Sequence, residues 1–119
     1  MKIITHQINK IKFAEIEDQS TIINSIEAAK DLLGEVYYQG YDGIILHQKN
    51  IDPAFFDLKN KMAGHILQKF STYRIIFIVL GDFKEFTSNS LNDFIWESNK
   101  GKMVNFLADI KAVQNRYSN

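Results

Sequence analysis

Polar side chains follow two of the predicted strands, and their types could bind an anion. The apolar run at residues 75–80 is followed by Asp82 and Phe83, and the run at 44–46 is followed by His47 and Lys49. In an open parallel sheet, ligands bind beyond the carboxyl ends of the strands. We therefore expect these side chains to lie along one edge of the sheet, where an anionic ligand could meet the Lys49 ammonium group.

The helix predicted after Phe83 would add hydrogen-bond donors to the same edge. Its first turn would direct backbone N–H groups outward, with Ser88 and Ser90 nearby. A helix N-terminus of this kind favours negative charge. The candidate ligand-binding residues are therefore Lys49, Asp82, Phe83, Ser88 and Ser90.

An ordinary structural role also fits these residues, and we consider it the simpler interpretation. Ser90 could cap the helix, with Asp93 three positions later in a pairing that resembles a capping box. Asp82 could satisfy its own turn, because aspartate often accepts a hydrogen bond from the backbone two residues on. A histidine at a strand end, such as His47, is more typical of hydrogen-bonded packing than of catalysis.

No set of residues in this chain converges on a known catalytic or metal-binding pattern. Asp93 and Glu97 lie one helical turn apart, but no histidine or cysteine accompanies them. His6, His47 and His65 are scattered, without the spacing of a zinc-binding helix. Phosphate-binding loops, dinucleotide fingerprints and nucleophile elbows are absent from the sequence. We predict no catalytic residue, no metal ligand and no cofactor.

Aromatic side chains are the remaining signal, and they favour contact with another protein. At 100° per residue, Trp96 lies about 140° from Leu91 on the helical wheel, which places it away from the sheet. Phe55 and Phe56 are adjacent, so we expect only one of them to point inward. Tyr38 belongs to a group of tyrosines at the end of the first helix. Exposed aromatics often mark protein contacts, and sideways packing between helices is the alternative.

The elements that position these residues alternate between strands and helices. Strands are predicted at 2–8, 11–17, 43–47, 74–80 and 103–107, with a two-residue turn at Asn9 and Lys10. Helices are predicted from about 20–25 to 39, from Asp52 and Pro53 to 70 with a break near 57–60, from Ser90 to Gly101, and around residues 110–117. Gly34 and Gly64 lie inside helices, where they would permit close packing on the sheet.

The order of elements is β-β-α-β-α-β-α-β-α, and it defines an α/β fold with a mostly parallel five-stranded sheet. Six consecutive apolar residues at 75–80 leave no polar face, so we expect all six to be buried between layers. Strands that alternate with helices form parallel sheets through right-handed crossovers. The first strand would be the antiparallel exception, at an edge of the sheet.

The composition limits the partners that the protein could have. The chain has 119 residues, which predicts one domain, residues 1–119. Fourteen basic and fourteen acidic residues cancel, so no basic field favours nucleic acid or an anionic membrane. The sequence contains no cysteine and no apolar run of membrane-spanning length. We expect a cytoplasmic domain that binds neither nucleic acid nor membranes.

The element order resembles the STAS domain, the SpoIIAA-like anti-sigma-factor-antagonist fold, over nearly the whole chain. That resemblance implies a scaffold in which a β-hairpin leads into alternating helices and strands. Its switch depends on a phosphorylatable Ser or Thr at the start of the helix after the third strand. Here the corresponding residues are 57–60, Asp-Leu-Lys-Asn, and no hydroxyl residue occurs between Asn50 and Phe70. We therefore expect no phosphorylation switch at that position.

Several short segments resemble a small bacterial family that is known only as a domain of unknown function. They are residues 55–58, 63–64, 67–71, 81–83, 93–95 and 97–101. This second resemblance implies no activity. We expect a non-enzymatic protein-interaction or regulatory module, which could also self-associate, with Trp96, Phe55 and Tyr38 as candidate contacts. The alternative is a domain that binds a small anionic ligand at the carboxyl edge of the sheet.

Overall fold

The computed structural model describes residues 1–118 as one sheet with helices on both faces. The strands are β1 (Lys2–Ile8), β2 (Ile11–Glu17), β3 (Gly43–His47), β4 (Ile76–Leu80) and β5 (Val104–Leu107). The helices are α1 (Ile26–Tyr38), α2 (Met62–Thr72), α3 (Asn89–Ser98) and α4 (Ile110–Tyr117). Three short 3₁₀ helices, η1 (Gln48–Asn50), η2 (Pro53–Phe56) and η3 (Leu58–Asn60), lie between β3 and α2.

The order of the strands in the sheet is the same as their order in the chain. β1 and β2 are antiparallel, and β2, β3, β4 and β5 are parallel to one another. The predicted hairpin turn is confirmed, since Ile8 pairs with Ile11 and Asn9 adopts a left-handed φ of 58°. The prediction of a mostly parallel five-stranded α/β sheet is therefore confirmed.

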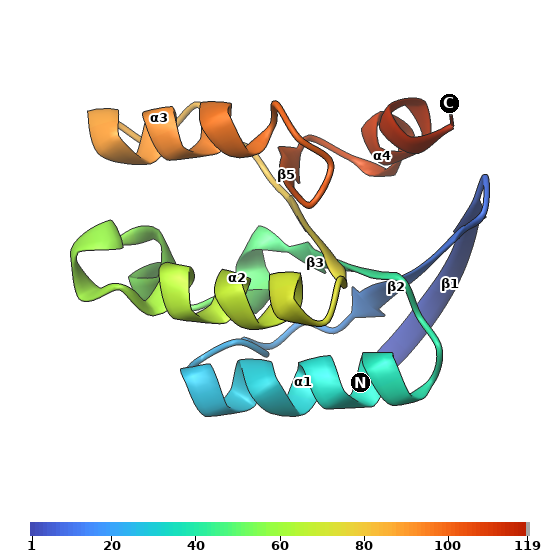
Figure 1. Ribbon diagram of the computed structural model, residues 1–119. Helices are drawn as coiled ribbons and strands as arrows, with labels where there is room; N and C mark the ends of the chain where they lie inside the picture. The colour runs from blue at the N-terminus through green and yellow to red at the C-terminus, as the bar shows by residue number, and fades with distance from the viewer. Residues whose placement is uncertain (119) are drawn as a thin grey trace.

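The three crossover helices all cover one face of the sheet. Right-handed crossovers that advance in the same direction place their helices on the same side, and α1, α2 and α3 lie together in Figure 1 while α4 lies apart. Their apolar side chains pack on Ala14, Ile44, Phe77 and Phe106 of the sheet. This face carries the larger core.

The second face of the sheet is covered by α4 alone. Val113 and Tyr117 of α4 pack on Phe13, Ile45 and Ile78. Because α4 has only eight residues, part of this face stays uncovered over β1 and the carboxyl half of β2. We call this region the open face, and it carries Ile4, His6 and Glu15, which are all only partly buried.

Five of the six residues in the apolar run 75–80 are buried, and the expectation was wrong for the sixth. Ile76 is partly exposed, because it begins β4 on the face that only α4 covers. Gly43, its partner in β3, has no room for a side chain there, since an added Cβ would lie 2.7 Å from the Phe13 ring.

Three other local predictions are corrected by the structure. α3 begins at Asn89, and Ser88 is its cap, with the Leu91 N–H donating to Ser88 Oγ at 3.3 Å, so Ser90 does not cap the helix. Gly34 and Gly64 do not mark close packing, because an added Cβ at either position would have no atom within 4 Å. Arg74 belongs to a turn with a φ of 57°, and the strand begins two residues later.

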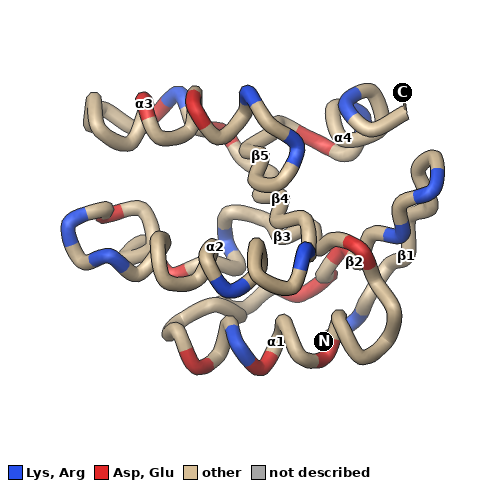
Figure 2. The backbone as a smooth tube through the Cα atoms, in the orientation of Figure 1, with Lys and Arg blue, Asp and Glu red and all other residues tan. Residues whose placement is uncertain are grey.

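Acidic and basic residues occur in every layer of the molecule, as Figure 2 shows. One stretch departs from this mixture. Residues 58–81 contain Lys59, Lys61, Lys69 and Arg74 but no aspartate or glutamate. The surface of α2 is therefore more basic than that of α1, which carries Glu27, Asp31 and Glu35 beside Lys30.

Candidate binding site at the carboxyl edge of the sheet

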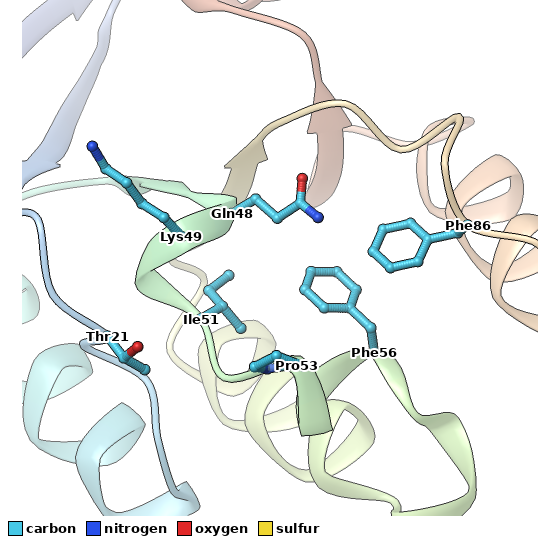
Figure 3. Close-up of a pocket in the computed structure, with 7 residues that line it drawn as sticks. All are labelled: Thr21, Gln48, Lys49, Ile51, Pro53, Phe56 and Phe86. Atoms are coloured by element: carbon cyan, nitrogen blue, oxygen red, sulfur yellow. The ribbon is translucent and has the colours of Figure 1, made fainter.

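A hollow of about 540 Å³ lies beyond the carboxyl end of β3. In Figure 3 the two phenylalanine rings stand side by side at one end of it, and Thr21 and Lys49 lie at the other. Its lining residues are Thr21, Gln48, Lys49, Ile51, Pro53, Phe56 and Phe86. The position agrees with the general location of ligand sites in open parallel sheets.

Asn50 holds the backbone around this hollow. Its buried side chain accepts from the His47 N–H at 3.0 Å and donates to the carbonyls of Asp18 and Ser20, both at 2.9 Å. Its own carbonyl accepts from the N–H groups of Ile22 and Ile23. One amide side chain thus ties the end of β3 to the segment between β2 and α1, which fixes both sides of the hollow.

The 3₁₀ helix η2 supplies the floor of the hollow. Asp52 caps it, since its Oδ1 accepts from the Ala54 N–H at 2.8 Å, and Pro53 occupies the first position. The expectation that only one of Phe55 and Phe56 points inward was wrong, because both are buried. Phe55 packs on Phe77 of the sheet, Phe56 packs on Phe86, and the two rings meet edge to face with centroids 5.1 Å apart.

Phe56 and Phe86 form an aromatic ridge at the edge of the hollow. Their rings are stacked, with centroids 5.1 Å apart and planes at 28°. Gln48 lies across Gly81 beside this ridge, and an added Cβ at Gly81 would collide with the Gln48 amide oxygen. Glycine at position 81 therefore leaves the space that lets Gln48 line the hollow.

The structure separates the predicted ligand-binding residues into three neighbouring hollows. Lys49 lines the first, which we call the edge hollow. Ser88 and Ser90 line a second, which shares Phe56 and Phe86 with the edge hollow. Asp82 and Phe83 line a third, together with Trp96. The third hollow shares no lining residue with the other two, so the five residues do not converge on one site.

Asp82 has the ordinary role that the sequence suggested, and Lys49 bonds to a neighbouring side chain. The Asp82 Oδ1 accepts from the Lys84 N–H at 3.1 Å, which satisfies the turn after β4. The Lys49 ammonium group donates to Gln19 Oε1 at 3.2 Å, and in Figure 3 its side chain extends away from the two phenylalanine rings. Lys49 therefore contributes mainly its aliphatic stem to the edge hollow.

A cluster of titratable side chains that was not predicted from the sequence lies on the open face. Glu15 of β2 lies between two histidines, with Oε1 at 2.7 Å from His6 Nε2 and Oε2 at 2.8 Å from His47 Nε2. The Glu15 side chain is only 13% exposed. One carboxylate therefore links three adjacent strands through charge-assisted hydrogen bonds.

The pKa of Glu15 is lowered from its ordinary value. Burial is the largest single influence and raises the pKa, but the hydrogen bonds from His6 and His47 and their charge lower it by more in total. The carboxylate is thus ionised at neutral pH. This arrangement holds two imidazoles in fixed orientations, and His47 also borders a hollow with Leu80 and Asp109 at the same edge of the sheet.

A second buried network attaches α4 to the end of β5. Asn105 Oδ1 accepts from Arg116 Nε at 3.0 Å and from the Tyr117 hydroxyl at 2.8 Å. Asn105 Nδ2 donates to the Gly101 carbonyl at 2.9 Å. Burial raises the pKa of Tyr117 to about 12. No buried side-chain nitrogen or oxygen in residues 1–118 lacks a hydrogen-bond partner, and this network has a structural role.

Two of the three aromatics proposed for protein contact are exposed. Trp96 is 64% exposed and Tyr38 is 90% exposed. The Lys100 ammonium group lies 3.9 Å from the centre of the Trp96 ring, a cation–π contact that shields one face of the indole. Phe55 is 1% exposed and cannot contribute to a surface.

Within residues 1–118, no three histidine, aspartate or glutamate side chains are arranged to hold a metal ion. None of the helices in this described part is long and apolar enough to span a membrane.

The fold and these hollows define an α/β protein with a singly wound sheet and a shallow apolar site at its carboxyl edge. Residues 8–117 match the family described as "Domain of unknown function (DUF4180)". Because the match covers most of the chain, the protein belongs to this family. The chain matches none of the curated proteins and none of the solved structures with which it was compared.

Proposed function

We propose that the domain is a non-enzymatic binding module that takes an extended segment of a partner protein at the carboxyl edge of its sheet. The observation that carries this proposal is the pair of hollows on either side of the Phe56–Phe86 ridge. Two hollows in series suit a polypeptide, which can place one apolar side chain in each. A compact small molecule would fill only one.

The chemistry of the lining supports binding over catalysis. Ile51, Pro53, Phe56 and Phe86 make the edge hollow mainly apolar, and its one charged group, Lys49, bonds to Gln19. The lining of this hollow contains no acid and base in hydrogen-bond contact with each other. The His6–Glu15–His47 cluster lies on the opposite face of the sheet from Phe56 and Phe86.

A small anionic ligand is the second candidate for the same site. Thr21, Gln48 and Lys49 each present a hydrogen-bond donor around the apolar part of the edge hollow. Lys49 forms no ion pair with any residue in 1–118. A small carboxylate with an apolar body would suit this combination if the Lys49 side chain turned inward.

A regulatory role in the cytoplasm and a STAS-like scaffold remain part of this proposal. The hairpin followed by alternating helices and strands supports the scaffold, and the absence of cysteine fits a reducing compartment. Residues 57–60 form η3 and its cap and contain no hydroxyl side chain, so a partner segment, rather than phosphorylation at that position, would control the domain.

Selection of short random peptides on the immobilised full chain tests the proposal. We expect enrichment of peptides with two spaced apolar residues. Phe86→Ala and Thr21→Arg should each weaken binding by about tenfold or more, because one removes half of the ridge and the other fills the hollow. Tyr38→Ala, which removes an exposed aromatic that lines neither hollow, should leave the affinity unchanged.

The proposal fails if no peptide is enriched, or if the enriched peptides bind equally to Thr21→Arg and to the unaltered chain. Thr21 is exposed, so this variant should keep the melting temperature of the parent. The second candidate is tested with benzoate as the probe. Chemical shift changes at the edge hollow that Lys49→Gln removes would favour the small-anion site over the peptide site.

A further inference from the structure

A second groove lies between α1 and α2, at a distance from the edge hollow and with no lining residue in common. It encloses about 240 Å³ and is lined by Lys30, Leu33, Gly34, Tyr37, Lys69 and Tyr73. Tyr37 and Tyr73 meet edge to face across it, with ring centroids 5.3 Å apart and planes at 71°. Both rings are more than half exposed, so this aromatic pair is available to a partner.

Gly34 forms part of this groove although the fold does not require a glycine there. It lies inside α1, where glycine is the weakest helix former after proline. An added Cβ would have no atom within 4 Å, so neither packing nor lack of space explains the residue. What the missing side chain does provide is the open space between Lys30 and Tyr37, one turn to either side. A local departure from helix propensity of this kind is typical of functional sites.

The two charged side chains that line the groove are both positive. Lys30 and Lys69 line it, and no acidic side chain does. Lys69 forms no ion pair within residues 1–118, and Lys30 has only an exposed partner, Glu27, at 3.4 Å. α2 belongs to the stretch 58–81, which has four basic residues and no acidic one, as the blue positions near α2 in Figure 2 illustrate.

We propose that the groove between α1 and α2 binds an acidic segment of a partner protein. The segment would place one apolar side chain over Leu33 and Gly34, against the Tyr37–Tyr73 pair. Carboxylates on either side of that residue would meet Lys30 and Lys69, and the tyrosine hydroxyls would donate to its backbone. This surface is separate from the edge hollow and rests on different observations, so the domain would contact two polypeptide segments at once.

Peptide selection with a matched pair of glycine variants tests this site. Gly34→Gln fills the groove, whereas Gly64→Gln makes the same change in α2 at a position that is equally open but does not line it. Both should raise the melting temperature, because glutamine forms helices better than glycine. We expect peptides with aspartate or glutamate flanking one apolar residue to be retained by the parent chain and by Gly64→Gln. Gly34→Gln should lose them by at least about tenfold.

A representative selected peptide should bind about twofold to fivefold more weakly to Lys69→Gln, and more weakly at higher salt. The proposal is overturned if no selected peptide is sensitive to Gly34→Gln, or if the sensitive peptides are neutral or basic. Peptides that lose affinity for Phe86→Ala and keep it for Gly34→Gln belong to the edge hollow. The two sites can therefore fail separately.

Discussion

The side chain of Glu15 links three neighbouring strands of the sheet. It accepts hydrogen bonds from His6 on β1 and from His47 at the end of β3. Its lowered pKa means that the folded state favours the ionised carboxylate. The two histidines therefore stabilise the sheet above the pH at which an unfolded glutamate is protonated, and this contribution is lost as the pH falls through the lower pKa of the folded state.

Replacing Glu15 with glutamine should test this account through the pH dependence of stability. At neutral pH we expect Glu15→Gln to lower the free energy of unfolding by about 1–3 kcal/mol, because hydrogen bonds to a charged group are lost. The difference between the two proteins should shrink below pH 4.5, the ordinary pKa of glutamate, as Glu15 itself becomes protonated. Urea unfolding at a series of pH values measures this difference in the free energy of unfolding.

Glu17→Gln is the control on the same strand. Its partner Lys2 lies at 3.6 Å and both side chains are exposed, so we expect a change of less than about 0.5 kcal/mol. A Glu15→Gln difference that stays constant from pH 7 to pH 3 would show that packing, rather than ionisation, accounts for the effect.

Asn105 is the second residue with a large expected effect. Asn105→Ala would leave the Tyr117 hydroxyl and Arg116 Nε without this acceptor, and we expect it to lower the free energy of unfolding by about 2–4 kcal/mol. Asn115→Ala, on the exposed side of α4, should change it by no more than about 0.5 kcal/mol. Urea titration followed by circular dichroism gives both values, and equal effects of the two variants would argue against the network.

The His6–Glu15–His47 cluster could be predicted from the sequence only in part. A two-residue turn at Asn9 and Lys10 fixes the hairpin register and places Ile4 opposite Glu15, two residues from His6 on the same face of the hairpin. The closeness of His6 and Glu15 could therefore be predicted from the hairpin alone. The position of His47 depends on the register between β2 and β3, which are separated by a whole helix, and no short-range pattern sets it.

At the scale of elements, the cap of α3 offers a direct comparison between two serines. Ser88→Ala should lower the free energy of unfolding by about 1 kcal/mol, because the Leu91 N–H loses its acceptor. Ser90→Ala should have almost no effect, since Ser90 lies exposed in the first turn and caps nothing. Thermal unfolding of the two variants in parallel measures the difference, and a larger loss for Ser90→Ala would contradict the assigned helix start.

The elements themselves were largely predictable, and their boundaries less so. Sequence patterns predicted the five strands and the four α-helices of residues 1–118, and Asp52 with Pro53 marked the start of η2, whereas η1 was not predicted. The chain after Pro53 forms two 3₁₀ helices before α2. Asp57 takes an extended conformation between η2 and η3, as the predicted break near 57–60 requires, and Lys61 takes a left-handed φ of 64° between η3 and α2. No sequence pattern predicts a left-handed conformation at Lys61, since positive φ is uncommon outside glycine and asparagine.

For the whole molecule, the exposed indole of Trp96 gives the most direct prediction about association. Trp96→Ala should leave the melting temperature nearly unchanged, because the side chain is mostly outside the core, and it should weaken any association with a second chain. Leu91→Ala on the same helix should cost about 2–5 kcal/mol, since Leu91 is buried. Calorimetry gives the stabilities, and sedimentation velocity gives the association.

A large loss of stability in a monomeric Trp96→Ala protein would show that the indole and Lys100 belong to the intramolecular packing. The contact surface would then be sought at the edge hollow and at the groove between α1 and α2 instead.

The placement of three helices on one face of the sheet could not be predicted from the apolar run 75–80, because that run predicts burial on both faces without indicating which element covers each. Ile76 is less buried than the other residues of this run, because only α4 covers its face of the sheet.

The identity of strand order and chain order has a consequence for synthesis on the ribosome. Each strand from β2 onward pairs with the strand made just before it, across a two-residue turn for β2 and across a helical connection for β3, β4 and β5. No new strand therefore waits for a partner that has not yet been translated. Loop closure is correspondingly short at every step, and short closures favour rapid folding. We expect ribosome-bound chains that expose residues 1–80 to resist proteolysis already, because β1 to β4 and both intervening helices can pack in the order in which they emerge.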